Sequence, residues 1–285
     1  MKSALKSVLI VGCGYLGLPL ARRFSTNGWQ VVGLTGSEES AERLSSESFP
    51  IIGLDVTTNL DRLQPRAFEI VVHCASSGRR GTQVYEAIFL RATRSLLSTL
   101  AVNHFMFVSS TSVYGQIDGS WVDENSLAEP SRETGLVLRA AEEIVLEQKG
   151  TVARLAGIYG PDRCVPLRKL LDQTAVIEGE GERFMNLIHR DDAVSALFSL
   201  AEKSLRGVYN VTDGEPVSQL NWFRYVCNQL DRPLPPFGPR DTTRKRGWTS
   251  KRVSNQKLRQ TGWKPRFKTF REGLDPLLGQ VKSQS

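Results

Sequence analysis

The sequence has no uninterrupted apolar stretch of the ~18 residues that a membrane-spanning helix needs. Its four cysteines and three histidines include neither a Cys-x-x-Cys pair nor a spacing typical of zinc ligands. We therefore expect no metal site, and we expect buried thiols in a reducing compartment. Residues 1–21 imitate a signal peptide, but glycines interrupt the apolar run and no small-residue cleavage motif follows. These absences predict a cytoplasmic protein without a membrane partner.

Charge is the one unusual feature of the composition. The 285 residues include 37 Lys and Arg against 30 Asp and Glu, a net charge of +7. Twelve basic side chains and one acidic side chain lie in residues 240–271, which gives this segment +11 and leaves −4 on the rest. Such a segment can bind nucleic acid, and Trp248 and Trp263 within it suggest aromatic stacking platforms. We favour a solvated basic face beside an anionic ligand, core packing for Trp263, and nucleic acid as the least favoured partner.

Apolar, β-rich stretches alternate with amphipathic helical stretches in the first part of the chain. We expect strands at 8–11, 30–34, 50–54, 70–74, 104–109 and 151–155, and helices ending near residue 28 and spanning 82–100 and 133–148. This alternation predicts an α/β protein with a Rossmann-type, doubly wound parallel sheet. After Gly160-Pro161 the pattern loosens, with helices near 191–203 and 218–230. We expect a Rossmann core over 1–165 and a small C-terminal substrate-capping lobe mainly over 166–285, with some segments returning to the core sheet.

A glycine-rich loop joins the first expected strand to the first expected helix. The pattern Gly12-x-Gly14-x-x-Gly17 is weak alone, but a strand before it and a helix after it are the context that dinucleotide binding requires. Gly12 permits a tight turn, Gly14 lets the backbone approach a pyrophosphate, and Gly17 lets the helix pack close to the strand. The helix N-terminus adds amide donors and positive potential. The loop therefore predicts an NAD(P) site.

The residues after the second strand bear on the choice between NAD and NADP. NAD-binding chains normally place an acid here for the ribose hydroxyls, and an Arg here accommodates NADP. The segment Leu34-Thr35-Gly36-Ser37 has neither. Its small hydroxyl side chains leave room for a 2′-phosphate that Arg22 or Arg23 could approach, so NADP is slightly favoured. Asp55, at the end of the third strand, is either an acceptor for the adenine amino group or a turn former.

The segment Val108-Ser-Ser-Thr-Ser-Val-Tyr-Gly115 resembles the extended short-chain dehydrogenase/reductases, the NAD-dependent epimerase/dehydratase group that includes UDP-galactose 4-epimerase. Further matching segments follow in order over nearly the whole chain: Gly12 to Gly17, Asp55-Val56, His73 to Ala75, Arg154 to Pro161, Asn186 to Asp192, Tyr209 to Gly214, Lys251 to Leu258 and Gly262 to Pro265. The resemblance implies NAD(P) held by Gly12, Gly14, Tyr15, Leu16, Gly17, Thr35, Ser37, Asp55 and Ala75. It also implies a possible homodimer through the helices at 82–100 and 133–148.

The catalytic pair of this family is missing at its expected positions. Members use a Ser or Thr after the fifth strand and a Tyr-x-x-x-Lys on the next helix, where a cationic Lys favours the phenolate of the Tyr. Ser110 falls on the catalytic hydroxyl, with Thr111 as the near alternative. Thr134 and Leu138 fall on the Tyr and Lys positions. The resemblance therefore implies a non-standard active site.

Shifting the register does not restore the pair. No Tyr lies between Trp121 and Gly150. Arg139 is one residue beyond the Lys position, which turns it by ~100° on the helix. The structural Asn of the family falls on Phe89.

Other side chains are candidates for the missing chemistry. Tyr114 and Tyr159 follow strands and are either substrate contacts or packing residues. His189 titrates near neutral pH and is a candidate acid/base or substrate contact, although the Asp191-Asp192 that follows it also suits a helix start. Arg183 is a predicted substrate contact. With Arg79, Arg80 and Arg190 it forms either a grip for an anionic substrate or a solvated basic rim.

These residues divide the functional question. The departures from the family pattern leave the residues expected to bind the cofactor in place. They remove the residues needed for alcohol oxidation by a tyrosinate. We expect an NAD(P)-dependent oxidoreductase or epimerase that acts on an anionic small molecule such as a nucleotide sugar, through a site containing Ser110. The alternative is a non-catalytic NAD(P)(H)-binding or redox-sensing protein.

Overall fold

The computed structural model describes residues 6–78, 81–241, 243 and 248–284. Two compact units are built from alternating segments of the chain. Unit 1 consists of Met1–Ser110, Glu133–Arg154 and Val194–Tyr209, and unit 2 of Thr111–Arg132, Leu155–Ala193 and Asn210–Ser285. The sequence-based division at residue 165 stays a prediction.

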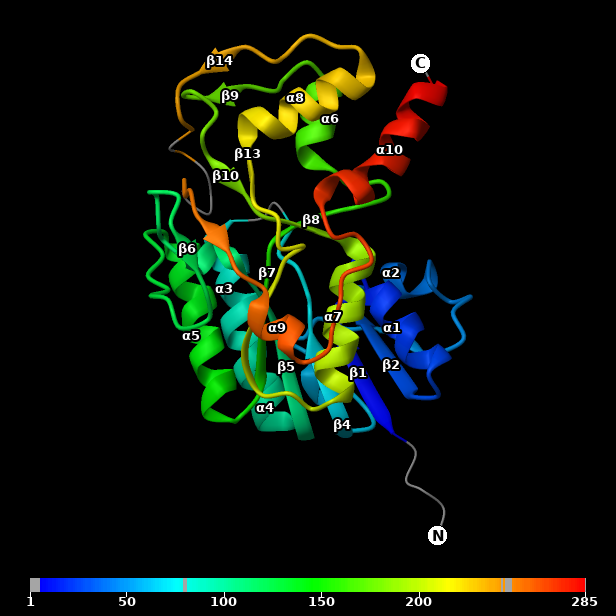
Figure 1. Cartoon of the computed structure of the whole chain (residues 1–285). Helices are drawn as coiled ribbons and strands as arrows, with labels where there is room; N and C mark the ends of the chain where they lie inside the picture. The colour runs from blue at the N-terminus through cyan, green and yellow to red at the C-terminus, as the bar shows by residue number, and fades with distance from the viewer. Residues whose placement is uncertain (1–5, 79–80, 242, 244–247, 285) are drawn as a thin grey trace. The chain divides into compact units, whose positions relative to one another are not determined.

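A seven-stranded sheet has the strand order β12-β7-β5-β4-β1-β2-β3 (Figure 1). Its strands are β1 (Ser7–Val11), β2 (Gln30–Thr35), β3 (Ile51–Gly53), β4 (Ala67–His73), β5 (Ala101–Ser110), β7 (Thr151–Leu155) and β12 (Gly207–Val211). β1 pairs in parallel with β2 and with β4, β2 with β3, and β4 with β5. This is the order of a doubly wound sheet, and it confirms the predicted Rossmann-type α/β fold.

The central strand shows why this sequence forms such a sheet. Val8 to Val11 are each at most 1% exposed. A parallel strand covered on both faces is a continuous apolar run rather than an alternating one. The chain leaves β1 toward β2 on one side, and β4 pairs on the other side, so the strand order reverses at β1. In open α/β sheets, ligands bind outside the carboxyl ends of the strands at such a reversal.

The helices and helical turns of unit 1 flank this sheet. They are α1 (Gly17–Thr26), α2 (Glu38–Glu42), η1 (Leu60–Arg62), α3 (Thr82–Glu86), η2 (Ala87–Arg91), α4 (Ala92–Thr99), α5 (Glu133–Glu147) and α7 (Arg190–Glu202), which begins in unit 2. Phe24 of α1 meets Phe198 of α7 edge-on, with ring centroids 4.9 Å apart. α3 and α4 instead pack with α5 (Figure 1).

The predicted helix over 82–100 is helical from Thr82 to Thr99, but its middle turn, η2, is π-helical rather than α-helical. Within this turn the Ile88 carbonyl lies 2.9 Å from Nε2 of His73. A carbonyl only accepts, so Nε2 carries the hydrogen. Burial lowers the pKa of His73 to about 4, which keeps the ring neutral. The wider turn thus coincides with a side-chain hydrogen bond to the helix backbone, a feature that apolar periodicity does not encode.

Unit 2 combines short strands with helices around its own apolar core. Its elements are η3 (Thr111–Val113), β6 (Trp121–Val122), β8 (Gly157–Tyr159), α6 (Val165–Leu171), β9 (Ile177–Glu178), β10 (Phe184–Met185), β11 (Leu187–His189), β13 (Val217–Ser218), α8 (Gln219–Leu230), β14 (Phe237–Gly238), β15 (Arg252–Val253), α9 (Gln256–Gln260) and α10 (Phe270–Gln284). The strands pair as β6 with β15, β8 with β11, β9 with β14 and β10 with β13. Ile177, Trp222, Phe223, Phe270 and Leu274 are at the centre of the core.

Among the described residues, no helix combines the length and the apolar character needed to cross a bilayer.

Candidate functional site

The glycine loop lies where the strand order reverses. Gly12 follows β1 with φ +102°, a conformation that favours glycine. A Cβ at Gly12 would lie 2.5 Å from the Cα of Ala75, just beyond the end of β4. The amides of Gly12 and Cys13 both donate to the Leu34 carbonyl of β2, at 3.0 and 2.8 Å. The loop is therefore fixed at its start by backbone from both neighbouring strands.

The other two glycines of the motif have different surroundings. A Cβ at Gly17 would overlap the Gly12 carbonyl oxygen, so α1 begins in direct contact with the turn after β1. Gly14 is exposed, and a Cβ there would have nothing within 4 Å. Steric demands of the fold therefore explain Gly12 and Gly17 but leave Gly14 unexplained. The open space at Gly14 is where a backbone-bound pyrophosphate would approach.

The start of α1 completes the loop. Leu16, a buried residue, is the N-cap, and no side chain among the described residues caps this helix end. The first N–H groups of an α-helix have no partner within the helix. With half-buried Tyr15, they present donors and positive potential suited to an anion.

The ribose end of the expected cofactor site is formed by β2 and the start of α2. Thr35 is buried and its hydroxyl donates to the Ser37 carbonyl at 3.1 Å. Ser37 caps α2, because its Oγ accepts from the Ser40 amide. A Cβ at Gly53 would lie 2.5 Å from the Ser37 carbonyl carbon, so β3 closes against this turn. Asp55 accepts from the amide and hydroxyl of Thr57, as a turn former does.

Both arginines considered for a 2′-phosphate already have partners. Arg22 forms a two-point ion pair with Glu47, whose Nε–Oε2 distance is 3.0 Å. The Arg23 guanidinium lies over the Phe198 ring, 5.1 Å from its centroid. A 2′-phosphate would compete with these contacts for either side chain.

The predicted catalytic hydroxyls lie at the end of β5 and in the turn that follows. Ser110 is the last residue of β5 and Thr111 the first of η3, and both are at most 9% exposed. On α5, Thr134 and Leu138 are both buried. Spacing of four residues places them on one helix face, as the resemblance requires of the Tyr and Lys positions.

A buried ionic network beside Ser110 was not predicted. Glu142 of α5 is fully buried and accepts from the Ser109 hydroxyl at 2.6 Å and from Arg154 Nη2 of β7 at 2.6 Å. Arg139 Nη1 adds a third contact at 2.5 Å and also reaches Glu143. Arg139 is thus hydrogen-bonded to two carboxylates. An arginine inside the apolar strand Thr151–Leu155 was the sequence signal that we overlooked.

Phe89, at the position of the family's structural Asn, belongs to an aromatic cluster. Its ring lies 4.4 Å from that of Tyr85 and 6.2 Å from that of Phe107, which in turn contacts His73. Phe89 is therefore a packing residue in the structure, and its match to the family's Asn stays a prediction.

The two candidate tyrosines of unit 2 both donate hydrogen bonds within that unit. The Tyr114 hydroxyl donates to Asn210 Oδ1 at 2.9 Å, and the Tyr159 hydroxyl donates to the Phe270 carbonyl at 3.3 Å. Each is at most 3% exposed. Burial raises the pKa of Tyr159 well above its ordinary value, so its hydroxyl is a poor base. Packing explains both residues, and their contact with substrate stays a prediction.

His189 also has structural partners. Its Nδ1 accepts from the Asp191 amide at 3.2 Å, and its ring packs against Tyr159 and Phe267. Burial lowers the pKa of His189. Asp192 accepts from the amides of Arg266 and Phe267, which ties this segment to the chain before α10. Catalysis by His189 stays a prediction.

The basic residues proposed to grip an anion are only partly assembled by the structure. Arg183 lies 3.5 Å from Glu178 Oε2, and Arg190 pairs with Asp191 at 3.1 Å. Arg79 and Arg80 lie outside the described residues. In the basic segment, Trp263 is buried, and Trp248 donates to Glu178 with Arg240 over its ring. Both tryptophans thus have partners within unit 2.

Asp213 of unit 2 is a buried acid whose state depends on pH. It is 4% exposed; the Glu215 amide donates to Oδ1 at 3.0 Å, and buried Oδ2 has no partner among the described residues. Burial raises the pKa of Asp213 to about 8, and the neighbouring Glu215 and Asp192 carboxylates add to the rise.

Stability is expected to fall as the pH rises from about 4 to 8, because over this range the folded protein holds a proton on Asp213 that the unfolded chain has lost. The slope contributed by one proton is at most ~1.4 kcal/mol per pH unit. Asp213→Asn, which mimics the neutral acid, should flatten this slope in urea unfolding series, whereas the exposed control Asp172→Asn should leave it unchanged. Equal slopes in wild type and Asp213→Asn would contradict the assignment.

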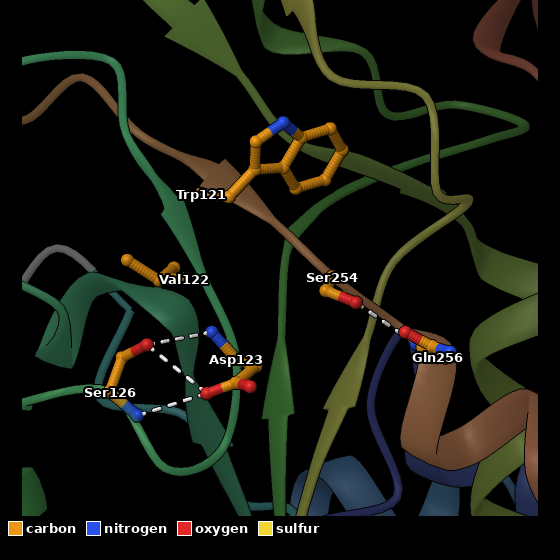
Figure 2. A pocket seen from close by; sticks show the side chains of 6 residues that line it. All are labelled: Trp121, Val122, Asp123, Ser126, Ser254 and Gln256. Carbon is orange, nitrogen blue, oxygen red and sulfur yellow. Dashed lines mark hydrogen bonds between the residues drawn. The ribbon is translucent and has the colours of Figure 1, made fainter.

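A groove of about 440 Å³ lies within unit 2. Figure 2 shows the residues that line it: Trp121, Val122, Asp123, Ser126, Ser254 and Gln256. The Ser126 hydroxyl donates a hydrogen bond to Asp123 Oδ1. None of these is a predicted site residue. The residues that line the groove are therefore different from those predicted to bind cofactor or substrate. No group of three potential metal ligands is found in the described part of the chain.

Comparison with known proteins agrees with this geometry. The family model "NAD dependent epimerase/dehydratase family" matches residues 8–212. Protein YeeZ of Escherichia coli (strain K12) is 33% identical over 221 residues, 73% of this chain and 77% of YeeZ.

Two solved structures show the same fold. MoeE5 in complex with UDP-glucose and NAD is 25% identical, with a TM-score of 0.79 over 98% of this chain and 100% of that chain. UDP-glucuronic acid 4-epimerase from Bacillus cereus, in complex with UDP-glucuronic acid and NAD, is 20% identical, with a TM-score of 0.80 over 98% and 100%. The likeness extends over nearly the full length of each chain.

Proposed function

The chain belongs to the NAD dependent epimerase/dehydratase family, and on this premise we propose that it is an NAD(P)-binding oxidoreductase or epimerase acting on an anionic small molecule. The observation that carries the proposal is the glycine loop, placed where the strand order reverses and open only at Gly14. MoeE5, which was solved with UDP-glucose and NAD, supports a nucleotide sugar as the first substrate class to test.

For the cofactor, we propose a nicotinamide dinucleotide held by the predicted loop residues, with the pyrophosphate on the start of α1. The bound group supplies hydride transfer, and the chain supplies binding and orientation. NAD in the MoeE5 structure supports NAD(H). The absence of an acid in residues 34–37 supports NADP(H), although Arg22 and Arg23 are already engaged. Competition between the four nicotinamide dinucleotides decides this point.

For the chemistry, we propose a site centred on the hydroxyl of Ser110, with Thr111 as the alternative. The positions of the usual base and its cation hold Thr134 and Leu138, which are buried on α5 and have no useful acid/base chemistry at neutral pH. The proposal includes a homodimer through α3, α4 and α5. An apolar side chain on α5, Leu136, is 56% exposed and is available for such a contact.

Ser110→Ala should lower kcat by about 10²-fold or more, because a positioned hydroxyl that handles a proton in the transition state contributes that much. Turnover of NADH and NADPH with a panel of nucleotide sugars, aldehydes and ketones measures this effect. Cofactor affinity by fluorescence titration should stay unchanged. A loss of kcat in Thr111→Val with full activity in Ser110→Ala would transfer the role to Thr111.

A second function is favoured by one observation: the hydroxyls of Tyr114 and Tyr159 are both used in hydrogen bonds within unit 2. If neither of these tyrosines acts as a base, the chain binds the dinucleotide as a non-catalytic or redox-sensing protein. Micromolar binding of NADH or NADPH without turnover of any substrate in the panel would support this alternative. Failure of all four dinucleotides to bind would contradict both functions.

A further inference from the structure

Lys251 is a buried lysine within unit 2. It is 4% exposed, and its Nζ donates to the Tyr114 carbonyl and to Thr249 Oγ1, both at 2.8 Å. An ammonium group has three donors. Two of them are used by neutral acceptors, so the protonated group has one donor left over and no counter-ion among these contacts.

The charge of Lys251 is not balanced by the protein. Among the residues that the structure describes, no carboxylate forms an ion pair with Lys251. Glu178, the acid that lies 3.5 Å from Arg183, also accepts from Trp248 Nε1 at 3.0 Å. Arg183 adds a second positive charge that acts on Lys251. Buried charges are normally paired, so this uncompensated cation needs an explanation.

The backbone around Lys251 is held firmly. Ser250 exchanges hydrogen bonds with the chain before β6, through the Gly119 amide and the Gln116 carbonyl, at 2.9 and 3.0 Å. On the other side, Asn186 donates to the Lys251 carbonyl at 2.9 Å and accepts from the Val253 amide at 2.8 Å. The ammonium group is therefore presented in a fixed position, which is what a binding site requires.

The partner of Lys251 places this charge beside a predicted site segment. Tyr114 closes the turn η3, since its amide donates to the Thr111 carbonyl at 3.3 Å. Lys251 thus contacts the turn that begins with a candidate catalytic hydroxyl, and all of these residues belong to unit 2.

We propose that the Lys251 ammonium, with the Arg183 guanidinium acting on it, is an anion-binding centre that takes a carboxylate or phosphate group of a ligand. The inference deepens the proposed function and rests on it for the anionic character of the substrate. An incoming oxyanion accepts from the third donor and balances the buried charge. Burial lowers the pKa of Lys251 to about 7, which fits a group that becomes fully protonated when an anion binds.

Calorimetric titration with inorganic sulfate, whose charge is constant from pH 6 to 9, tests this centre. Sodium chloride at equal ionic strength is the control. Lys251→Met should bind sulfate at least about tenfold more weakly than wild type, a loss of ~1.4 kcal/mol or more. Lys264→Met removes one exposed charge from the same basic segment and should bind as wild type does.

The stability of unliganded Lys251→Met separates binding from a structural role. Removing an uncompensated buried charge should leave its melting temperature equal to or above that of wild type. A lower melting temperature with unchanged sulfate affinity would overturn the proposal, as would a wild type that binds sulfate no better than chloride.

A measurement on wild type alone covers the case in which Lys251→Met does not fold. Sulfate affinity should fall about tenfold or more between pH 6 and pH 9, because the ammonium is lost while Arg183 stays charged. Unchanged affinity over this range would also overturn the proposal. Glu178 pairs with Arg183, and the same titration of Glu178→Gln measures the contribution of Glu178 to the pH dependence.

Two further arms identify the source of the anion and keep the two proposals distinct. Displacement of sulfate by UDP-glucose identifies a substrate group, whereas phosphate that binds alongside saturating UDP-glucose identifies a free anion. Sulfate binding without dinucleotide binding would contradict the proposed function but not the anion-binding centre. Dinucleotide binding without sulfate binding would sink the centre alone.

Discussion

Glu142→Gln is expected to lower the free energy of unfolding by about 3–5 kcal/mol, the cost of removing one partner of a buried ion pair. Glu142 forms an ion pair with Arg154, and both side chains are at most 3% exposed. A neutral amide removes the Glu142 counter-ion from the buried Arg154 guanidinium. Urea unfolding followed by circular dichroism measures the loss.

The neighbouring residue provides the matched control. Glu143 carries the same chemistry on the same helix and contacts the same Arg139, but its side chain is 62% exposed. Exposed ion pairs contribute about 0–1 kcal/mol. Glu143→Gln should therefore change stability by less than ~1 kcal/mol, and equal effects of the two variants would contradict the assignment of Glu142 as the centre of the network.

A double variant distinguishes loss of charge balance from loss of packing. The double variant Glu142→Met/Arg154→Met removes both buried charges at similar side-chain volume. Such a change is often neutral or stabilising. We expect the double variant to recover most of the stability lost in Glu142→Gln. If it is less stable than the single variant, hydrogen bonds to Ser109 and Arg139 rather than the ion pair dominate.

Gly14→Ala is expected to weaken dinucleotide binding by about tenfold or more while leaving the fold intact. The added methyl group meets nothing within 4 Å in the protein, so the melting temperature should shift by no more than ~2 °C. The same methyl group would occupy the space through which the backbone approaches a pyrophosphate. Titration with NADH and NADPH, together with thermal melting, measures both effects.

Gly17→Ala should reverse this pattern, because its Cβ would overlap the Gly12 carbonyl oxygen and force α1 away from β1. We expect a clear loss of stability in Gly17→Ala, measured as a lower melting temperature. Gly279→Ala, in α10 with nothing within 4 Å, is the control for a glycine-to-alanine change in open space. Full affinity in Gly14→Ala would remove the main support for a pyrophosphate on this loop.

Local pattern was sufficient for much of the fold. Strands β1, β2, β4, β5 and β7 each lie within a few residues of the predicted ranges, because a buried parallel strand is a continuous apolar run. The glycine loop was equally visible, since its position between strand and helix is local information. The π-helical turn within the helix over 82–99 was not predicted, because it involves a hydrogen bond from His73, a residue of β4.

The site shows the same division. Motif spacing predicts a catalytic hydroxyl at Ser110 and predicts that Thr134 and Leu138 occupy the Tyr and Lys positions, because such predictions need only the order of residues along the chain. The partners of Tyr114, Glu142 and Lys251 lie far away in the sequence, at Asn210, Arg154 and Tyr114 respectively. Spacing carries no information about such pairs.

The sequence by itself determined the fold class and the glycine loop between the first strand and the first helix, because backbone periodicity and motif spacing are properties of contiguous residues. Only the tertiary structure decided which charges are buried and which are balanced. It balanced Glu142 with two arginines and left Lys251 without a carboxylate partner in the described part of the chain. Burial and pairing depend on residues brought together from distant segments of the chain. Desolvation makes a buried charge costly unless a protein group or a ligand of opposite charge pairs with it.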